Sequence, residues 1–229
     1  EGVGIDLALQ ADKAELLDRD DIGAVVTGPI TIRSNGKGGE IGGDFDVIRS
    51  RFTLGRAAAI AEIPELRLIE KNSRAGDFVP VQRGTTWLLN MKANARNRLM
   101  VQGMGLSSEW RMDLDIKGSV ADPMLLGRAD LVRGSYDFAG RRFDLTSGTL
   151  RFDGSVPANP TLDITAQASI SDLDATIHIT GTSAAPEIAF TSTPAMPQEE
   201  LLSRLLFGSS ITQLSAPEAL QLASAVGSL

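Results

Sequence analysis

The chain has a single histidine, His178, which is the first residue to consider for acid–base or metal chemistry. It stands between Ile177 and Ile179, at a polar position of an alternating segment, and therefore on the outward side of an expected strand. A nucleophilic triad needs an adjacent nucleophile, and a zinc site needs several further ligands. We interpret His178 as a surface or hydrogen-bonded side chain.

Aspartates in the C-terminal half are the candidates for paired-carboxylate chemistry. Glycoside hydrolysis requires two carboxylates facing each other across a cleft, and a calcium loop requires denser oxygen ligands than the turn at 171–174 offers. The glycine-rich tract 36–43 lacks the Lys-Ser/Thr of a phosphate loop. We therefore predict that the chain is not an enzyme and needs no metal and no cofactor. The aspartates concerned, all at polar strand positions or in turns, are Asp113, Asp115, Asp137, Asp144, Asp153, Asp163, Asp172 and Asp174.

Composition limits the class of partner. The net charge is −7, the isoelectric point is near 4.8, and no run of Lys and Arg occurs. Nucleic acids and anionic lipid headgroups are bound by clustered cations, so neither is expected as a partner. Cysteine is absent, which excludes disulfides and thiolate metal sites. No apolar run approaches the ~20 residues of a membrane span, and the chain begins at Glu1. We expect any targeting segment or membrane anchor to lie outside these residues.

The elements that carry these residues are predicted to be β-strands. Apolar and polar residues alternate in segment after segment, most clearly over 110–117 and 162–170. Successive side chains of a strand point to opposite faces, so the pattern predicts a sheet with one apolar face and one polar face. The apolar face is the candidate site for binding lipid or an unfolded strand. Its candidate residues are Trp110, Met112, Leu114, Ile116, Leu162, Ile164, Ile177, Ile179, Ile188 and Phe190.

Segments in the N-terminal part are less regular. The charged run 12–21 fits a short helix or an irregular connection, and 35–43 fits a hairpin turn. The stretches 45–47 and 52–54 suggest two short strands.

Further along, 57–61 fits one helical turn and 66–70 fits a strand. The polar stretch 71–82 is the best candidate for a long loop or a joint between subdomains. The face that each residue of 98–106 takes is ambiguous.

One turn device recurs in the C-terminal half. A strand ends in Gly-Ser or Gly-Thr, and the next strand opens near a proline, where the missing N–H costs no ladder hydrogen bond. The spacing is irregular, which favours an elongating sheet over a strict solenoid. The three glycine–proline pairs are Gly118 and Pro123, Gly154 and Pro160, and Gly181 and Pro186.

After Thr193 the apolar period changes from two residues to three and four, which predicts a helix that ends at Gly208. A short amphipathic helix is only marginally stable by itself in water, so its apolar side should dock on the sheet or on a partner. The candidate docking residues are Leu201, Leu202, Leu205, Leu206 and Phe207.

A second short helix is predicted to follow. Ser215 and Glu218 have the spacing of a capping box, which marks a helix start. Leu220, Ala223 and Val226 would form the apolar side of this helix.

Together these observations predict an all-β fold: an elongated, curved, mostly antiparallel sheet over 1–193, with two short helices of the same domain over 194–229. Patterning alone leaves open whether the apolar face is an open hydrophobic trough or the sealed core of a structural or adhesive β-solenoid or sandwich. Aromatic residues make up only 5% of the chain, and many apolar positions hold Ala or Gly. A dense core usually depends on larger side chains, so these features favour the trough.

The segments 97–98, 103–110 and 131–168 resemble the TamB family, the translocation and assembly module subunit of Gram-negative envelopes. Each motif is weak alone, and their common order makes the resemblance specific. The residues that carry it are RGSYDFAGRRF (133–143), GTLRFDG (148–154), NPTLDI (159–164), ITG (179–181) and PAMPQEELLSRLLFG (194–208).

The resemblance implies a β-taco, which is a curled sheet forming an open trough with a hydrophobic interior. It also implies a location in the periplasm of a Gram-negative bacterium, an inner-membrane anchor outside this fragment, and an outer-membrane barrel partner of the TamA or BamA type. The implied role is to guide phospholipid acyl chains between the inner and outer membranes, to support outer-membrane protein insertion, or both. Members continue with further strands after the second helix, so we expect this chain to be truncated.

Overall fold

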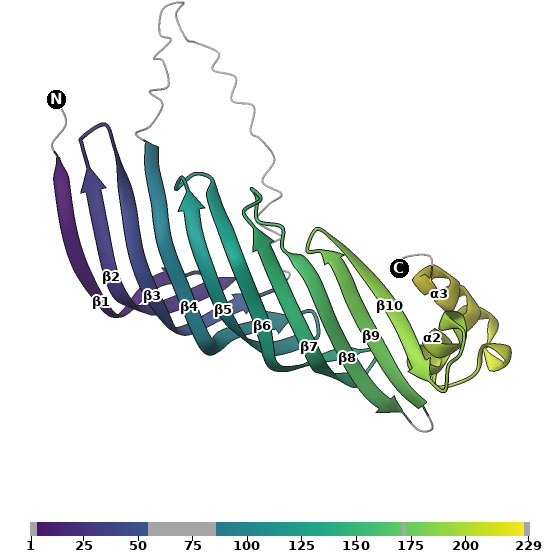
Figure 1. Ribbon diagram of the computed structural model, residues 1–229. Helices are drawn as coiled ribbons and strands as arrows, with labels where there is room; N and C mark the ends of the chain where they lie inside the picture. Colours follow the sequence, from purple (N-terminus) through teal and green to yellow (C-terminus); the bar gives the residue numbers. More distant parts are fainter. Residues whose placement is uncertain (1–3, 55–85, 171–172, 227–229) are drawn as a thin grey trace, which may run out of the picture.

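The computed structural model describes residues 4–54, 86–170 and 173–226. Within these residues the chain forms one ten-stranded sheet, and the strands occur in the sheet in the order of the sequence (Figure 1). Neighbours are antiparallel except for β3 and β4, which are parallel. The all-β, mostly antiparallel prediction is confirmed. The strands are β1 (Ile5–Asp18), β2 (Ile22–Ser34), β3 (Gly38–Thr53), β4 (Thr86–Gly103), β5 (Leu106–Gly118), β6 (Pro123–Phe138), β7 (Arg141–Asp153), β8 (Thr161–Ile170), β9 (Leu173–Thr182) and β10 (Ala185–Thr193).

The predicted alternation sets the two faces of the sheet, and β5 shows it clearly. Trp110 and Leu114 are 1% and 6% exposed, whereas Arg111 and Asp113 on the other face are exposed. The described strands belong to a single sheet, so within them no second sheet is stacked on the first as in a sandwich.

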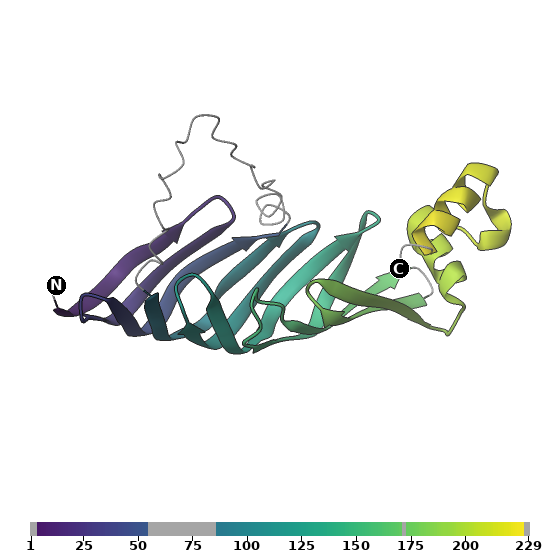
Figure 2. The same cartoon turned by 90° about the horizontal axis from the view of Figure 1, so that it is seen from above.

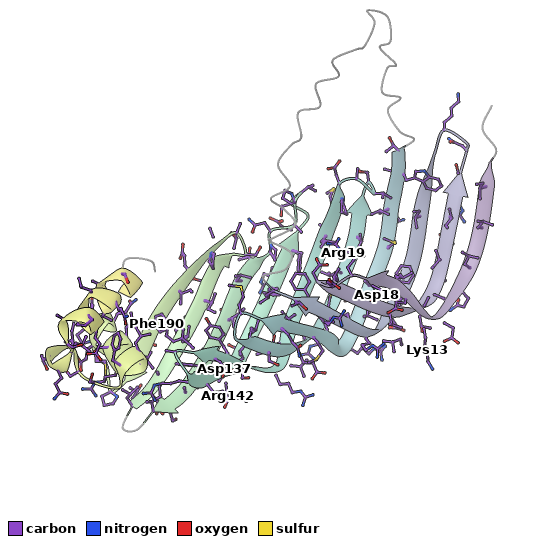
Figure 3. The ribbon with its side chains drawn as sticks, turned by 180° about the vertical axis from the view of Figure 1, so that it is seen from behind. Lys13, Asp18, Arg19, Asp137, Arg142 and Phe190 are labelled. Atoms are coloured by element: carbon purple, nitrogen blue, oxygen red, sulfur yellow. The ribbon has the colours of Figure 1, made fainter. Side chains whose placement is uncertain are left out.

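The sheet is strongly curved, because the strands of its N-terminal half bend midway and fold it into a trough (Figures 1 and 2). Register shifts occur at 11–14 in β1, at 46–50 in β3 and at 96–99 in β4. Lys13, at the bend of β1 in Figure 3, has a φ of 51°. A β-bulge bends its strand and increases the local twist, so this line of irregular pairings accounts for the curvature.

Bulges also explain three differences from the sequence-based expectations. The run 12–21 is not a helix, and only 19–21 form a connection, because β1 continues through its bulge to Asp18. The stretches 45–47 and 52–54 are not two separate strands. Residues 45–47 and 52–53 belong to β3, which bends between them and ends at Thr53. The ambiguous segment 98–106 completes β4 and then turns into β5. The helical turn, strand and joint expected at 57–61, 66–70 and 71–82 lie outside the described residues.

The recurring glycine turn has a backbone cause. Gly118 and Gly181 have φ values of 86° and 81°, in the left-handed region that side chains rarely adopt. A Cβ at either position would lie 2.6 Å from a backbone carbonyl oxygen, that of Asp122 or of Ala185. Glycine is therefore the residue that closes these turns with the smallest steric cost.

The helical segment follows β10 at one end of the sheet (Figure 2). It consists of α2 (Gln198–Phe207), the short 3-10 helix η1 (Ile211–Gln213) and α3 (Ala216–Val226). As predicted, α2 ends at Gly208, whose φ is 73° and whose N–H donates to the Arg204 carbonyl at 3.1 Å. The main hydrophobic core lies where α2 meets the C-terminal strands. Its buried members are Phe143, Leu145, Ala166, Leu173, Ala175, Ile177, Phe190, Leu201, Leu202, Leu205 and Leu222.

The start of α3 confirms the capping box, because the Ser215 backbone N–H and hydroxyl donate to Glu218 Oε2 at 2.8 and 2.6 Å. Its expected apolar side is wrong. Leu220 is 74% exposed and Ala223 is also exposed, whereas Leu222 is 4% exposed and packs in the main core. Leu222 lies on a different side of the helix from Leu220, and the contact of α3 with α2 buries the side that carries Leu222.

Candidate functional site

The candidate binding residues of the C-terminal strands form rows across the sheet. Ile164 on β8 pairs with Ile179 on β9, which pairs with Ile188 on β10. In the neighbouring row, Ile177 pairs with Phe190. Directly opposed residues share a face and contact each other, so each row is a continuous apolar strip.

Another row joins these strands to β5. Met112 on β5 pairs with Ala129 on β6, Ala129 pairs with Leu150 on β7, and Leu150 pairs with Leu162 on β8. The two groups of candidate residues are therefore parts of one apolar face. The candidate residues predicted from the sequence did not include Ala129 or Leu150.

The ten candidate residues differ in accessibility. Trp110, Leu114, Ile177 and Phe190 are buried, with exposed fractions of 1%, 6%, 1% and 7%. The other six candidates are intermediate, so apolar surface on these side chains is still accessible to a ligand. They are Met112, Ile116, Leu162, Ile164, Ile179 and Ile188.

Trp110 is held as part of the folded structure. Its Nε1–H donates to Ser108 Oγ at 2.9 Å, which satisfies the one polar group of the buried ring. A Cβ at Gly148 would lie 2.8 Å from Trp110 Cη2 and 3.1 Å from Leu131 Cβ. The absence of a side chain at Gly148 therefore makes the space that the indole occupies.

An aromatic cluster lies beneath the helices and was not predicted. Phe138 contacts Tyr136, Phe143 and Phe190, with ring centroids 6.3, 6.5 and 5.5 Å apart. Figure 3 shows Phe190 beside the helices. The available signal was the Tyr136, Phe138 and Phe143 spacing around one hairpin, which places three aromatic side chains within reach of each other.

The helix-docking candidates lie against this cluster. Leu201, Leu202 and Leu205 are at most 1% exposed, and Leu206 and Phe207 are partly buried against the main core. Their packing covers Ile177 and Phe190, which leaves the apolar face of the last strands partly occupied by the chain itself.

Two polar side chains fix the position of α2. Arg141, at the start of β7, donates from Nε to the Leu205 carbonyl at 3.2 Å and from Nη2 to the Arg204 carbonyl at 3.5 Å. Glu200 accepts from the Ile211 backbone N–H at 3.0 Å and from Arg204 Nε at 2.8 Å. The hydrogen bond from Ile211, supported by the Arg204 side chain, lowers the pKa of Glu200.

The opposite face of the sheet is polar. Its ion pairs include Arg128 with Asp130 at 2.7 Å and Arg133 with Glu109 at 2.6 Å, and both arginines are more than half exposed. His178 is exposed on this face, with Nδ1 3.4 Å from Thr165 Oγ1. Within the described ranges, no group of three or more His, Asp or Glu side chains is arranged to hold a metal ion. Asp172 lies outside those ranges.

No helix in the described part of the chain is long and apolar enough to cross a membrane. Fold and site together define a class: an extended single-sheet β-protein with a continuous apolar face, covered by a helix at one end. The chain belongs to the TamB family, because the family model of the TamB C-terminal domain matches residues 1–229. It is similar to the translocation and assembly module subunit TamB of Haemophilus influenzae, with 24% identity over 196 residues. That match covers 80% of this chain and 15% of the relative.

Proposed function

We propose that this chain is part of a non-enzymatic cell-envelope module whose apolar trough guides phospholipid acyl chains between the inner and outer membranes. The observation that carries the proposal is the accessible part of the apolar face. Half-buried aliphatic residues lie on two rows of the same face: one runs from Met112 on β5 to Leu162 on β8, and the other from Ile164 on β8 to Ile188 on β10.

The size of the expected binding energy suits transit. Burying one methylene contributes about 0.8 kcal/mol, so a sixteen-carbon chain half covered by the trough would gain about 6 kcal/mol. The half-buried residues are similar aliphatic groups, so neighbouring positions would bind a chain about equally well. A chain held by many similar shallow sites can move along them.

The proposal extends to location and partner. The H. influenzae relative is by name a subunit of a translocation and assembly module, which supports an assembly partner for this chain. We place the chain in the periplasm, with the full-length protein anchored in the inner membrane and partnered by an outer-membrane barrel protein of the TamA or BamA type.

A second candidate function is to support insertion of outer-membrane proteins by receiving their unfolded strands. It is favoured by the H. influenzae relative, which is by name a subunit of a translocation and assembly module.

Lipid that copurifies with the chain tests the first function. Native mass spectrometry after mild extraction should show bound phospholipid, and Ile164→Arg should remove most of it by placing a charge on the accessible row. Gln167→Arg is the matched control, since Gln167 is exposed on the opposite face of the same strand. Equal lipid loss in both variants, or no lipid in the parent, would contradict acyl-chain guidance and favour a sealed structural module. Binding of an unfolded outer-membrane strand that survives Ile164→Arg would favour the second function.

A further inference from the structure

We propose that α2 is a side wall that closes the row of Ile177 and Phe190 to acyl chains, and that Arg141 is the positioning residue that holds it there. The inference rests on the proposed function, because a side wall has meaning only if acyl chains occupy the neighbouring accessible row. It assigns a role to the helix beyond stabilising the fold.

The first observation is the change in exposure between neighbouring rows of the same face. Ile164 and Ile188 keep accessible surface, whereas Ile177 and Phe190 in the next row are 1% and 7% exposed. The buried leucines of α2 belong to the same core as these two side chains. An acyl chain can therefore lie along the row of Ile164, Ile179 and Ile188, whereas α2 covers the row beside it.

The second observation is how the helix is held. The last carbonyls of a helix have no partner within the helix and attract cations. Arg141 donates to the carbonyls of Arg204 and Leu205, at 3.5 and 3.2 Å, from a hairpin distant in sequence. A single side chain thus ties the end of α2 to the sheet.

The consequence is a lateral limit on the path. A ligand that enters over β5 and β6 can follow accessible residues as far as Ile188 on β10, but it cannot move sideways beneath α2. The side wall thus confines the ligand to one part of the apolar face.

Photo-crosslinking tests the side wall with two conservative replacements. Benzoylphenylalanine is placed at Phe152, which is half-buried on β7, or at Phe190, in the row that α2 covers. The chain is incubated with phosphatidylethanolamine–phosphatidylglycerol vesicles and irradiated. Lipid adducts are expected at position 152 and not at 190. Equal adducts at both positions would overturn the side wall and leave acyl-chain guidance standing. No adduct at either position would overturn both.

The role of Arg141 is tested in the same assay. Removing the hydrogen bonds of a charged side chain should increase the fraction of molecules in which α2 is detached from the sheet about tenfold. Arg141→Ala should therefore raise adducts at position 190 about tenfold. Amide hydrogen exchange in α2 should quicken by a similar factor without any lipid. Arg142→Ala, which removes the same charge from the same hairpin, should change neither readout, because Arg142 pairs only loosely with Asp144 at 3.7 Å. If the two variants behave alike, Arg141 does not position the helix.

Discussion

At the scale of single residues, the empty space at Gly148 determines how Trp110 packs. Gly148→Ala should destabilise the chain by about 1–3 kcal/mol, because the new methyl group would lie 2.8 Å from the indole ring and the core must shift to accept it. Urea unfolding measures the loss. Repeating the substitution in a Trp110→Phe background supplies the control, since the smaller ring leaves room. An equal cost in both backgrounds would mean that Trp110 is not the obstacle.

The same pair shows what residue types alone can predict. Alternation correctly places Trp110 on the apolar face of β5, opposite the exposed Arg111. Alternation does not reveal how deeply the ring is buried, because the space for the ring is left by Gly148, two strands away. Cross-strand packing depends on register, which is set by bulges that leave no clear mark in the sequence.

At the scale of the element, Glu200 connects α2 to the segment before α3. Hydrogen bonds from Ile211 and from the Arg204 side chain lower its pKa below the ordinary value of 4.5. The carboxylate therefore stabilises the folded helical segment above that pH, and the contribution is lost as the pH falls through the lower folded-state value. The protection of the η1 amides, measured relative to their intrinsic exchange rates at each pH, should fall over this acidic range. Glu200→Gln should show quick exchange already at neutral pH.

Glu199→Gln is the matched control for this prediction. Glu199 is the exposed neighbour of Glu200 in the same first turn, so its replacement changes the charge equally without touching η1. If both variants quicken exchange, the effect comes from helix charge and not from the Glu200 hydrogen bonds.

Helix ends were more predictable than helix packing. The end of α2 at Gly208 and the Ser215–Glu218 cap follow from local signals, which need no knowledge of the rest of the chain. The side of α3 that is buried, with Leu222 inward and Leu220 outward, depends on where α2 lies. The contacts of Glu200 and Arg141 likewise join segments that the sequence does not place together.

At the scale of the whole molecule, alternation predicts the two faces of the sheet but not its shape. The trough arises where bulges at 11–14, 46–50 and 96–99 bend consecutive strands (Figure 1). The same curvature and the position of α2 divide the apolar face into accessible and covered parts. That division decides which apolar residues can tolerate a charge.

A pair of arginine substitutions measures this division in the folded chain. Ile177→Arg should destabilise it by more than about 4 kcal/mol, because Ile177 is 1% exposed beneath α2 and the guanidinium would be buried without a partner. Ile164→Arg should cost only about 1–2 kcal/mol, since a half-buried side chain can extend its charged end into water while its stem covers the sheet. Urea unfolding of both variants supplies the comparison. Equal and severe losses would show that the row of Ile164 is as closed as the row of Ile177, and acyl chains would then have no accessible path along the sheet.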